Sequence, residues 1–166
     1  MKFIVVICFV SILFSCSKSE DKSHEFSNFT SRIFKDETYW NTKSAYGVYH
    51  LKDSMQYIIA YGDNNERISI VFKKDQKKTG RQEAFKASLI EANCETCASL
   101  KNSYSVDSTK TNSVEFLIFD NSVTPNRVGI RFSINLKRDS LYTDYKPSQV
   151  LYNGVIVVPF ENETGV

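Results

Sequence analysis

Two cysteines, Cys94 and Cys97, are the residues of this sequence whose type and spacing most directly suggest chemistry; Glu95 and Thr96 lie between them. Two thiols at this spacing pair as a disulfide in an oxidising compartment. The closed loop is so short that chain entropy would contribute only about 2 kcal/mol to folding. The spacing therefore predicts a structural disulfide.

A redox-active role is the alternative interpretation of the same pair. It needs a strand before Cys94 and a helix that begins there, because the helix dipole lowers the thiol pKa. Asn102 and Ser103 would soon interrupt such a helix. A structural zinc would need two further ligands, and the sequence has no second C-x-x-C and only two histidines, His24 and His50. We therefore expect no metal and no other cofactor.

Hydrolytic catalysis has little support from the sequence. His24 lies near the N-terminal segment, so a Ser-His-Asp site would depend entirely on His50. No G-x-S-x-G, H-E-x-x-H or P-loop pattern occurs. We expect no catalytic residues, and the sequence leans towards a protein that is not an enzyme.

Aromatic residues give the remaining hint of a binding site. Planar rings that are exposed can stack on a sugar or a peptide. Tyrosine is also a favoured residue of strands, so a role in the sheet or its core is the alternative. The candidate ligand platform consists of Tyr39, Trp40, Tyr46 and Tyr49.

The N-terminal segment carries a targeting signal. Met1 and Lys2 give a positive start, and an apolar run follows over residues 3–14 with one interruption, at Ser11. Twelve residues are too few to span a bilayer, which needs about 20, but they suit the core of a signal peptide.

This apolar run ends in Leu13-Phe14-Ser15-Cys16, which resembles the lipobox of bacterial lipoprotein precursors. Phe14 departs from the usual small or aliphatic residue at its position. The resemblance implies that residues 1–15 are removed and that the thiol of Cys16 receives acyl chains. Two or three chains, at about 0.8 kcal/mol per buried CH₂, anchor a protein firmly on a membrane. An ordinary secretory signal with a chance cysteine is the alternative.

A polar tether, residues 16–23, follows the cleavage site. In the lipoprotein family, an Asp directly after the modified Cys retains the protein at the inner membrane. Ser17 stands there in this chain, which favours the outer membrane. Glu20 and Asp21 resemble a surface-export signal, although Ser19 separates them from Lys18. We therefore expect an outer-membrane lipoprotein, on the periplasmic face or at the cell surface.

The rest of the chain, residues 24–166, reads as one mainly β domain. Apolar and polar residues alternate over 128–136 and 67–73, as in strands with one buried face. The run 55–61 precedes 67–73 across a short Gly/Asp/Asn loop, which predicts a hairpin. Residues 114–119 and 155–160 are apolar on both faces. Pro159 should end that last strand or lie at a sheet edge.

Two segments also fit helices. Phe26, Phe29, Ile33 and Phe34 share one helical face, which predicts a short helix. Residues 81–92 fit either a helix or a strand, and their composition leans slightly to a helix. We predict a mainly β fold, an antiparallel sandwich or small barrel with one or two short helices; an α+β fold is the alternative.

Composition narrows the function further. The chain has 166 residues, of which 24% are charged and 42% hydrophobic, and its net charge is only +2. These values suit one globular domain and give no reason to expect a nucleic-acid partner. We expect a non-catalytic binding or structural role in the envelope, with a glycan, peptide or protein ligand. The alternatives are a thiol-disulfide enzyme using Cys94 and Cys97 and a lipocalin-like carrier of a small ligand.

Overall fold

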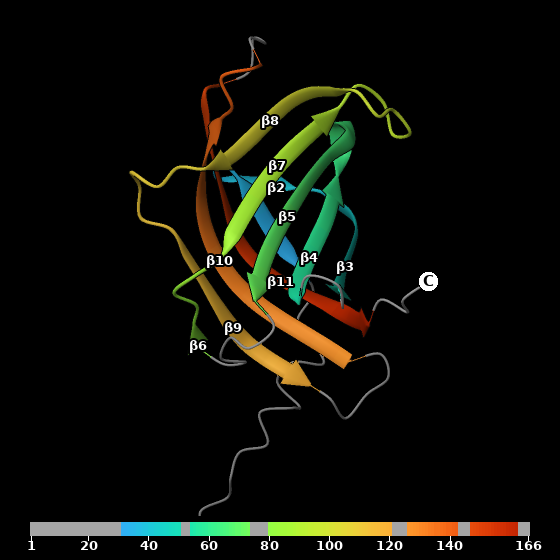
Figure 1. Ribbon diagram of the computed structural model, residues 1–166, viewed down its shortest axis with the longest axis vertical. Coiled ribbons are helices and arrows are strands. Elements are labelled where there is room, and N and C mark those ends of the chain that lie inside the picture. The colour runs from blue at the N-terminus through green and yellow to red at the C-terminus, as the bar shows by residue number, and fades with distance from the viewer. Residues whose placement is uncertain (1–30, 51–53, 74–79, 121–125, 143–146, 163–166) are drawn as a thin grey trace, which may run out of the picture.

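Alternating side chains build one large sheet of eleven strands (Figure 1). The computed structural model describes residues 31–50, 54–73, 80–120, 126–142 and 147–162. The strands are β1 (Arg32–Lys35), β2 (Thr38–Trp40), β3 (Thr42–His50), β4 (Met55–Gly62), β5 (Glu66–Lys73), β6 (Gly80–Arg81), β7 (Lys86–Ala92), β8 (Leu100–Val106), β9 (Ser113–Asp120), β10 (Asn126–Arg138) and β11 (Gln149–Asn162). A single 3₁₀ turn, Asp63–Asn65, joins β4 to β5.

The strand pairings form a closed cycle. The order runs β11-β3-β4-β5-β7-β8-β10, and β10 pairs with β11 along almost its whole length. In Figure 1, β4, β5 and β7 lie side by side, and the long strand β10 curves round beside them. The side chains that face into this cycle form one hydrophobic core, which includes Ile58, Ile70, Leu89, Ile134 and Ile156.

Two short seams complete the cycle. One is the pairing of β8 with the end of β10, and the other is the pairing of β3 with the end of β11. The second seam is parallel, and every other pairing is antiparallel. The mainly β prediction is confirmed, but the sheet is mixed and not purely antiparallel.

The N-terminal hairpin β1–β2 joins the free edge of β11 beside the first half of that strand. Gly154 makes this approach possible, because a Cβ there would overlap the backbone of Arg32, and its φ of +144° suits glycine alone. The hairpin turns at Asp36 and Glu37, which both have positive φ, as a two-residue type I′ turn requires.

The predicted helices do not appear in the described residues. Ile33 and Phe34 lie in β1, and residues 81–92 contain the end of β6 and all of β7. In both segments, cross-strand pairing outweighs a weak helical pattern, because β1 docks on β11 and β7 fills the place between β5 and β8. Phe26 and Phe29 lie outside the described residues.

The five predicted strands are present as β4, β5, β9, β10 and β11, with boundaries that differ by up to six residues. The hairpin of β4 and β5 is confirmed. β11 continues past Pro159 to Asn162, so of the two predicted outcomes the structure shows the second, a position on an edge that is locally unpaired among the described strands. The N–H of Val157 points to the edge that faces β1, where it donates to Ser31 Oγ. Pro159, two residues on, presents its nitrogen to the same edge, where β11 pairs with neither β1 nor β3.

Candidate functional site

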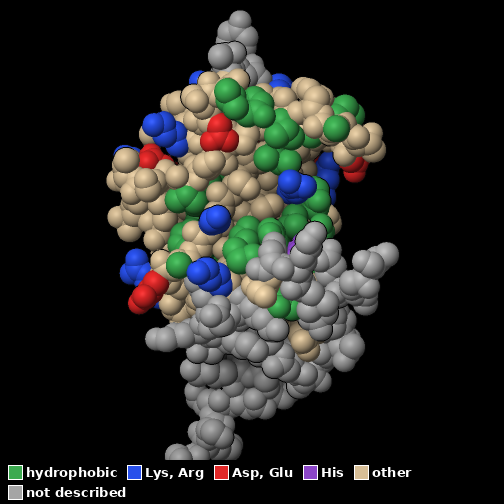
Figure 2. Space-filling view, viewed as in Figure 1, with side chains coloured by type: hydrophobic (Ala, Val, Ile, Leu, Met, Phe, Trp, Pro, Cys, Tyr) green, Lys and Arg blue, Asp and Glu red, His purple; other side chains and the backbone are tan. Residues whose placement is uncertain are grey.

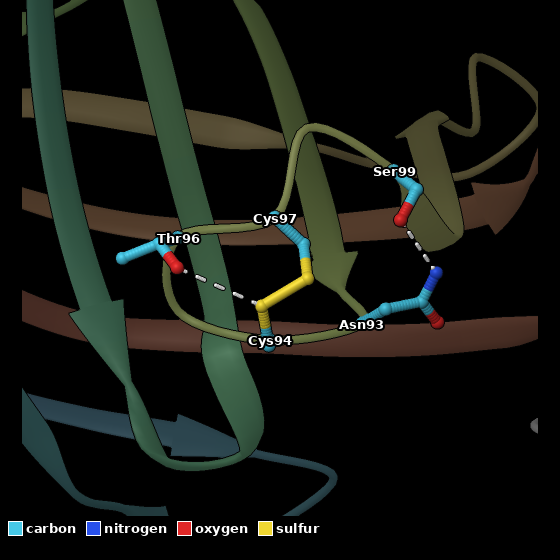
Figure 3. Close-up of a disulfide and its surroundings, with 5 residues drawn as sticks. All are labelled: Asn93, Cys94, Thr96, Cys97 and Ser99. Carbon is cyan, nitrogen blue, oxygen red and sulfur yellow. Dashed lines mark hydrogen bonds between the residues drawn. A yellow bond between two sulfur atoms is a disulfide. The ribbon is translucent and has the colours of Figure 1, made fainter.

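The disulfide lies at the tip of the β7–β8 hairpin (Figure 3). Cys94 and Cys97 are joined with their Cα atoms 5.0 Å apart. The N–H of Cys97 donates to the carbonyl of Cys94, and Asn93 Nδ2 donates to Ser99 Oγ across the base of the loop at 2.9 Å. The bond therefore pins a loop that two strands already hold.

This setting differs from the one that a reactive thiol pair requires. The chain after Cys97 enters β8 at Leu100, so no helix begins at either cysteine. The dipole of a helix that begins at a cysteine lowers the thiol pKa, and this pair has no such helix. The local geometry suits a structural bond.

The four aromatic residues of the predicted ligand platform do not share a surface. Trp40 and Tyr49 are buried in the core, whereas Tyr39 and Tyr46 are exposed. Tyr39 packs edge-on against Phe34, and Tyr46 stacks on Tyr61 with ring centroids 6.3 Å apart. Alternation along the strands turns Trp40 and Tyr49 inward and Tyr39 and Tyr46 outward, so the four residues form no single platform.

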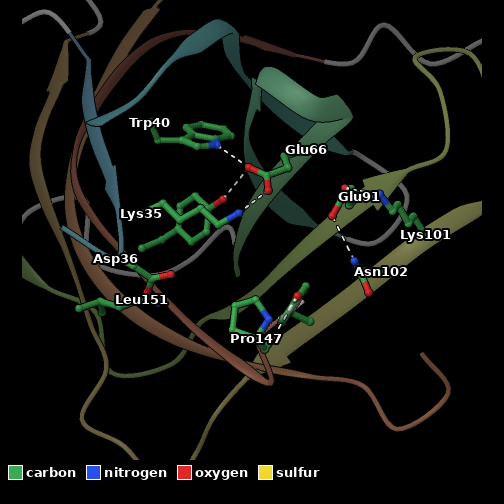
Figure 4. A network of polar contacts seen from close by, with 11 residues as sticks. Lys35, Asp36, Trp40, Glu66, Glu91, Lys101, Asn102, Pro147 and Leu151 are labelled. Atoms are coloured by element: carbon green, nitrogen blue, oxygen red, sulfur yellow. Dashed lines mark hydrogen bonds and ion pairs between the residues drawn. The ribbon is translucent and has the colours of Figure 1, made fainter. Parts of the chain in front are cut away.

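A buried carboxylate, Glu66, organises the interior beside the N-terminal hairpin (Figure 4). Its Oε2 accepts hydrogen bonds from Trp40 Nε1 at 2.7 Å and from Tyr152 Oη at 3.0 Å. Its Oε1 accepts from Lys35 Nζ, which also pairs with it as an ion. Gly62 makes room for the indole of Trp40, since a Cβ there would overlap the ring. Glu66 is therefore paired in charge and satisfied in hydrogen bonds.

Burial raises the pKa of Tyr152, and the negative charge of Glu66 and its hydrogen bond raise it further. The ring of Tyr152 also lies edge-on to Trp40, with centroids 5.5 Å apart, and Lys35 Nζ lies 5.8 Å from its centroid. Each strand of this network contributes one or two inward side chains. The arrangement holds the β1–β2 hairpin to β5 and β11.

A second buried carboxylate, Glu91, lies directly opposite Glu66 on β7. Asn102 Nδ2 donates to it at 3.1 Å, and Lys101 Nζ approaches it at 3.6 Å. Asn102 is fully buried, and its Oδ1 has no hydrogen-bond partner. In Figure 4 that oxygen points away from Glu91, so it does not complete a ligand set with the two carboxylates.

A groove of about 410 Å³ lies on the outer face of the sheet. Its floor follows one line across four paired strands, from Ser44 to Tyr61, Arg67 and Ile90. Its remaining lining includes Lys43, Asn65, Glu95, Cys97 and Leu100. The disulfide loop thus forms one wall, and the 3₁₀ turn forms part of the rim.

Arg67 is the cation on the floor of this groove. Its Nε is buried without a hydrogen-bond partner, and no ion pair joins its guanidinium to another residue that the structure describes. Lys43 is engaged differently, because its Nζ lies 3.7 Å from Asp63. Among the described residues, no acidic side chain neutralises Arg67.

The aromatic side of the groove has its own electrostatics. Tyr61 lines the groove and Tyr46 stacks beside it. A hydrogen bond with Tyr61 raises the pKa of Tyr46, while the charge of Arg67 acts in the opposite direction. Tyr46 therefore keeps its phenolic proton at physiological pH. On the face seen in Figure 2, Lys and Arg side chains lie among hydrophobic ones.

Part of these sites has a signal in the sequence. The alternation over residues 67–73 turns Ile68, Ile70 and Phe72 inward, and the same alternation continued back by one residue places Glu66 inward and Arg67 outward. Neither the buried network nor the groove is among the sequence-based predictions. Cys16 and the tether lie outside the described residues.

Within the described ranges, no cluster of His, Cys, Asp and Glu is large enough to hold a metal ion. No helix in that part of the chain has the length and hydrophobicity to cross a membrane. No protein-family model matches the chain, and neither a curated protein nor a solved structure is similar to it.

Proposed function

We propose that this chain is a lipid-anchored protein of the bacterial outer membrane that binds a small ligand, without catalysis, in its outer groove. The observation that carries the binding role is the groove with Arg67 on its floor, whose Nε is buried with no hydrogen-bond partner in the part of the chain that the structure describes. A volume of about 410 Å³ falls in the usual range of small-molecule sites. The lipobox-like Leu13-Phe14-Ser15-Cys16 supports the anchor.

The proposal puts the ligand outside the closed cycle of strands. The inward side chains form one packed core, and the buried carboxylate Glu66 has donors on both oxygens. These observations give less support to a lipocalin-like carrier, which would need an internal cavity. The position of the disulfide on a hairpin tip likewise gives little support to a thiol-disulfide enzyme.

The anchor is tested by labelling cells with radioactive palmitate. The wild type should incorporate the label, and Cys16→Ser should not, because the acylated thiol is gone. Equal labelling of the two proteins would remove the anchor from the proposal. Protease treatment of intact cells then reports the side of the membrane. If Glu20 and Asp21 act as an export signal, replacing both with Ala should protect a protein that is otherwise cleaved.

The binding role is tested by titrating the purified full chain with a library of neutral, acidic and basic ring compounds. Chemical shifts of backbone amides locate each hit. Hits that perturb Tyr61, Arg67 and Ile90 support the groove, with Glu115 and Arg131, which do not line it, as the internal references. A library that perturbs no groove residue would overturn the proposed binding role.

A further inference from the structure

We propose that the outer groove takes a sugar ring that carries one carboxylate, such as a uronic acid unit of a polysaccharide. The inference rests on the proposed function and deepens it by naming the class of ligand. Three features of the groove carry it: its charge, its mixed apolar and hydroxyl lining, and the strands beneath it.

Charge complementarity points to an anion with one negative charge. The lining carries two basic residues, Arg67 and Lys43, and one acidic residue, Glu95. Lys43 is also held by Asp63, which leaves the guanidinium as the available cation. A planar guanidinium matches a carboxylate with two parallel hydrogen bonds. A phosphate monoester carries about −1.5 to −2 at pH 7 and would be less well compensated.

The remaining lining fits a ring with one apolar face and several hydroxyl groups. Tyr61 and Ile90 flank Arg67 on the neighbouring strands and offer an aromatic ring and an aliphatic side chain. Ser44 on the floor and Asn65 at the rim add hydrogen-bonding groups. A sugar presents C–H groups on one face and hydroxyls at its edge, which is the combination that this lining complements.

The strands beneath the groove argue against an extended peptide. β4, β5 and β7 are each paired on both edges, so their backbone groups are already used in the sheet. A peptide over Arg67 could not gain the main-chain hydrogen bonds that give strand addition its affinity. Recognition must therefore come from side chains, which favours a compact ligand.

The test is calorimetric titration of the full chain, purified from membranes in detergent, with methyl galactosiduronate, a single sugar ring that carries one carboxylate. Its methyl ester, the neutral methyl galactoside, galactose 6-phosphate and benzoate serve as comparison ligands. We expect methyl galactosiduronate to bind most tightly. The ester and the neutral sugar should bind about tenfold more weakly or worse, since each lacks the charge that pairs with arginine.

Variants separate the roles of the groove residues. Arg67→Gln should weaken methyl galactosiduronate binding about tenfold or more, and Arg67→Lys should retain part of the affinity because it keeps the charge but loses the planar fork. Tyr61→Leu should weaken the acidic and the neutral sugar alike. Arg131→Gln is the matched control, because Arg131 is an exposed arginine on β10 that pairs with Glu115. Arg131→Gln should change the affinity for the acidic sugar less than twofold. Unchanged melting temperatures would show that each variant is folded.

Several results would overturn the inference. If neutral and acidic sugars bind equally, or if Arg67→Gln and Arg131→Gln behave alike, the carboxylate has no role. Tighter binding of galactose 6-phosphate or benzoate would replace the acidic sugar with another class of anion. In all these cases groove binding itself stands if the shifts still map to Tyr61 and Ile90. The absence of any binding there would overturn both proposals.

Discussion

Glu66 and Arg67 are adjacent in β5, yet they have opposite surroundings. Glu66 points inward and accepts hydrogen bonds from Lys35, Trp40 and Tyr152. Arg67 points outward into the groove, and its Nε has no partner. A buried charge that is fully paired holds strands together, whereas a half-buried charge without a partner is available to a ligand. The comparison shows how one strand can serve structure on one face and binding on the other.

The largest expected effect is on the inward side. Glu66→Ala would leave Lys35, Trp40 and Tyr152 without their shared acceptor, and removing one partner of a buried pair costs about 3–5 kcal/mol. Arg67→Ala should change the free energy of unfolding by about 0.5 kcal/mol or less, since no partner is lost. Urea unfolding of both variants measures the difference. Equal losses would break the distinction between the two residues.

Removal of the hydroxyl of Tyr152 tests one arm of the same network. Tyr152→Phe should cost about 1.5–3 kcal/mol near neutral pH, because a buried hydrogen bond to a charged group is lost. The cost should shrink above pH 10. The pKa of Tyr152 is raised in the folded protein, so the unfolded chain ionises first, near its ordinary value of about 10, and wild-type stability then falls.

Urea unfolding from pH 8 to pH 11 on the wild type and Tyr152→Phe isolates this residue from the other tyrosines and lysines. The gap between the two proteins should narrow as pH rises. A gap that stays constant or widens would contradict the raised pKa.

Removal of the disulfide tests whether the loop that forms one wall of the groove takes part in binding. Replacing Cys94 and Cys97 with Ser should cost about 2 kcal/mol of stability, because the loop that it closes is short. Ligand affinity should fall as well, since the loop lines the groove. Thermal unfolding and titration of the double variant check both effects. Reduced stability with unchanged affinity would show that the loop takes no part in binding.

The smallest expected effect is a gain in stability. Glu37 has a φ of 66° in the type I′ turn that brings Lys35 to Glu66. Glu37→Gly should stabilise the protein by about 0.5–1 kcal/mol, because glycine adopts this conformation without a steric cost. Urea unfolding measures the gain, and Asp36→Gly is an informative comparison. That variant should lose stability, because the carboxylate of Asp36 accepts from the N–H of Leu151 at 2.8 Å.

Much of the sheet could be predicted from the sequence, because strand alternation is a local signal. The alternation over residues 128–136 fixed the two faces of β10, and the hairpin of β4 and β5 followed from two patterned runs and a turn. β1 and β7 could not be assigned this way, because Phe26, Phe29, Ile33 and Phe34 fit a helix and residues 81–92 fit a helix as well as a strand. Pairing with other strands decided both: β1 pairs with the distant strand β11, and β7 lies between β5 and β8.

For the sites, too, the sequence determines some features and the tertiary structure decides the others. The sequence by itself determined the cysteine spacing that allows a short disulfide, the lipobox-like motif at Cys16, and the alternation that turns Glu66 and Arg67 to opposite faces. Only the tertiary structure decided that Lys35, Trp40 and Tyr152 converge on Glu66, and that Ser44, Tyr61 and Ile90 align with Arg67 across four strands. The physical reason is that alternation sets which face a side chain takes, whereas the register between distant strands sets which side chains it meets.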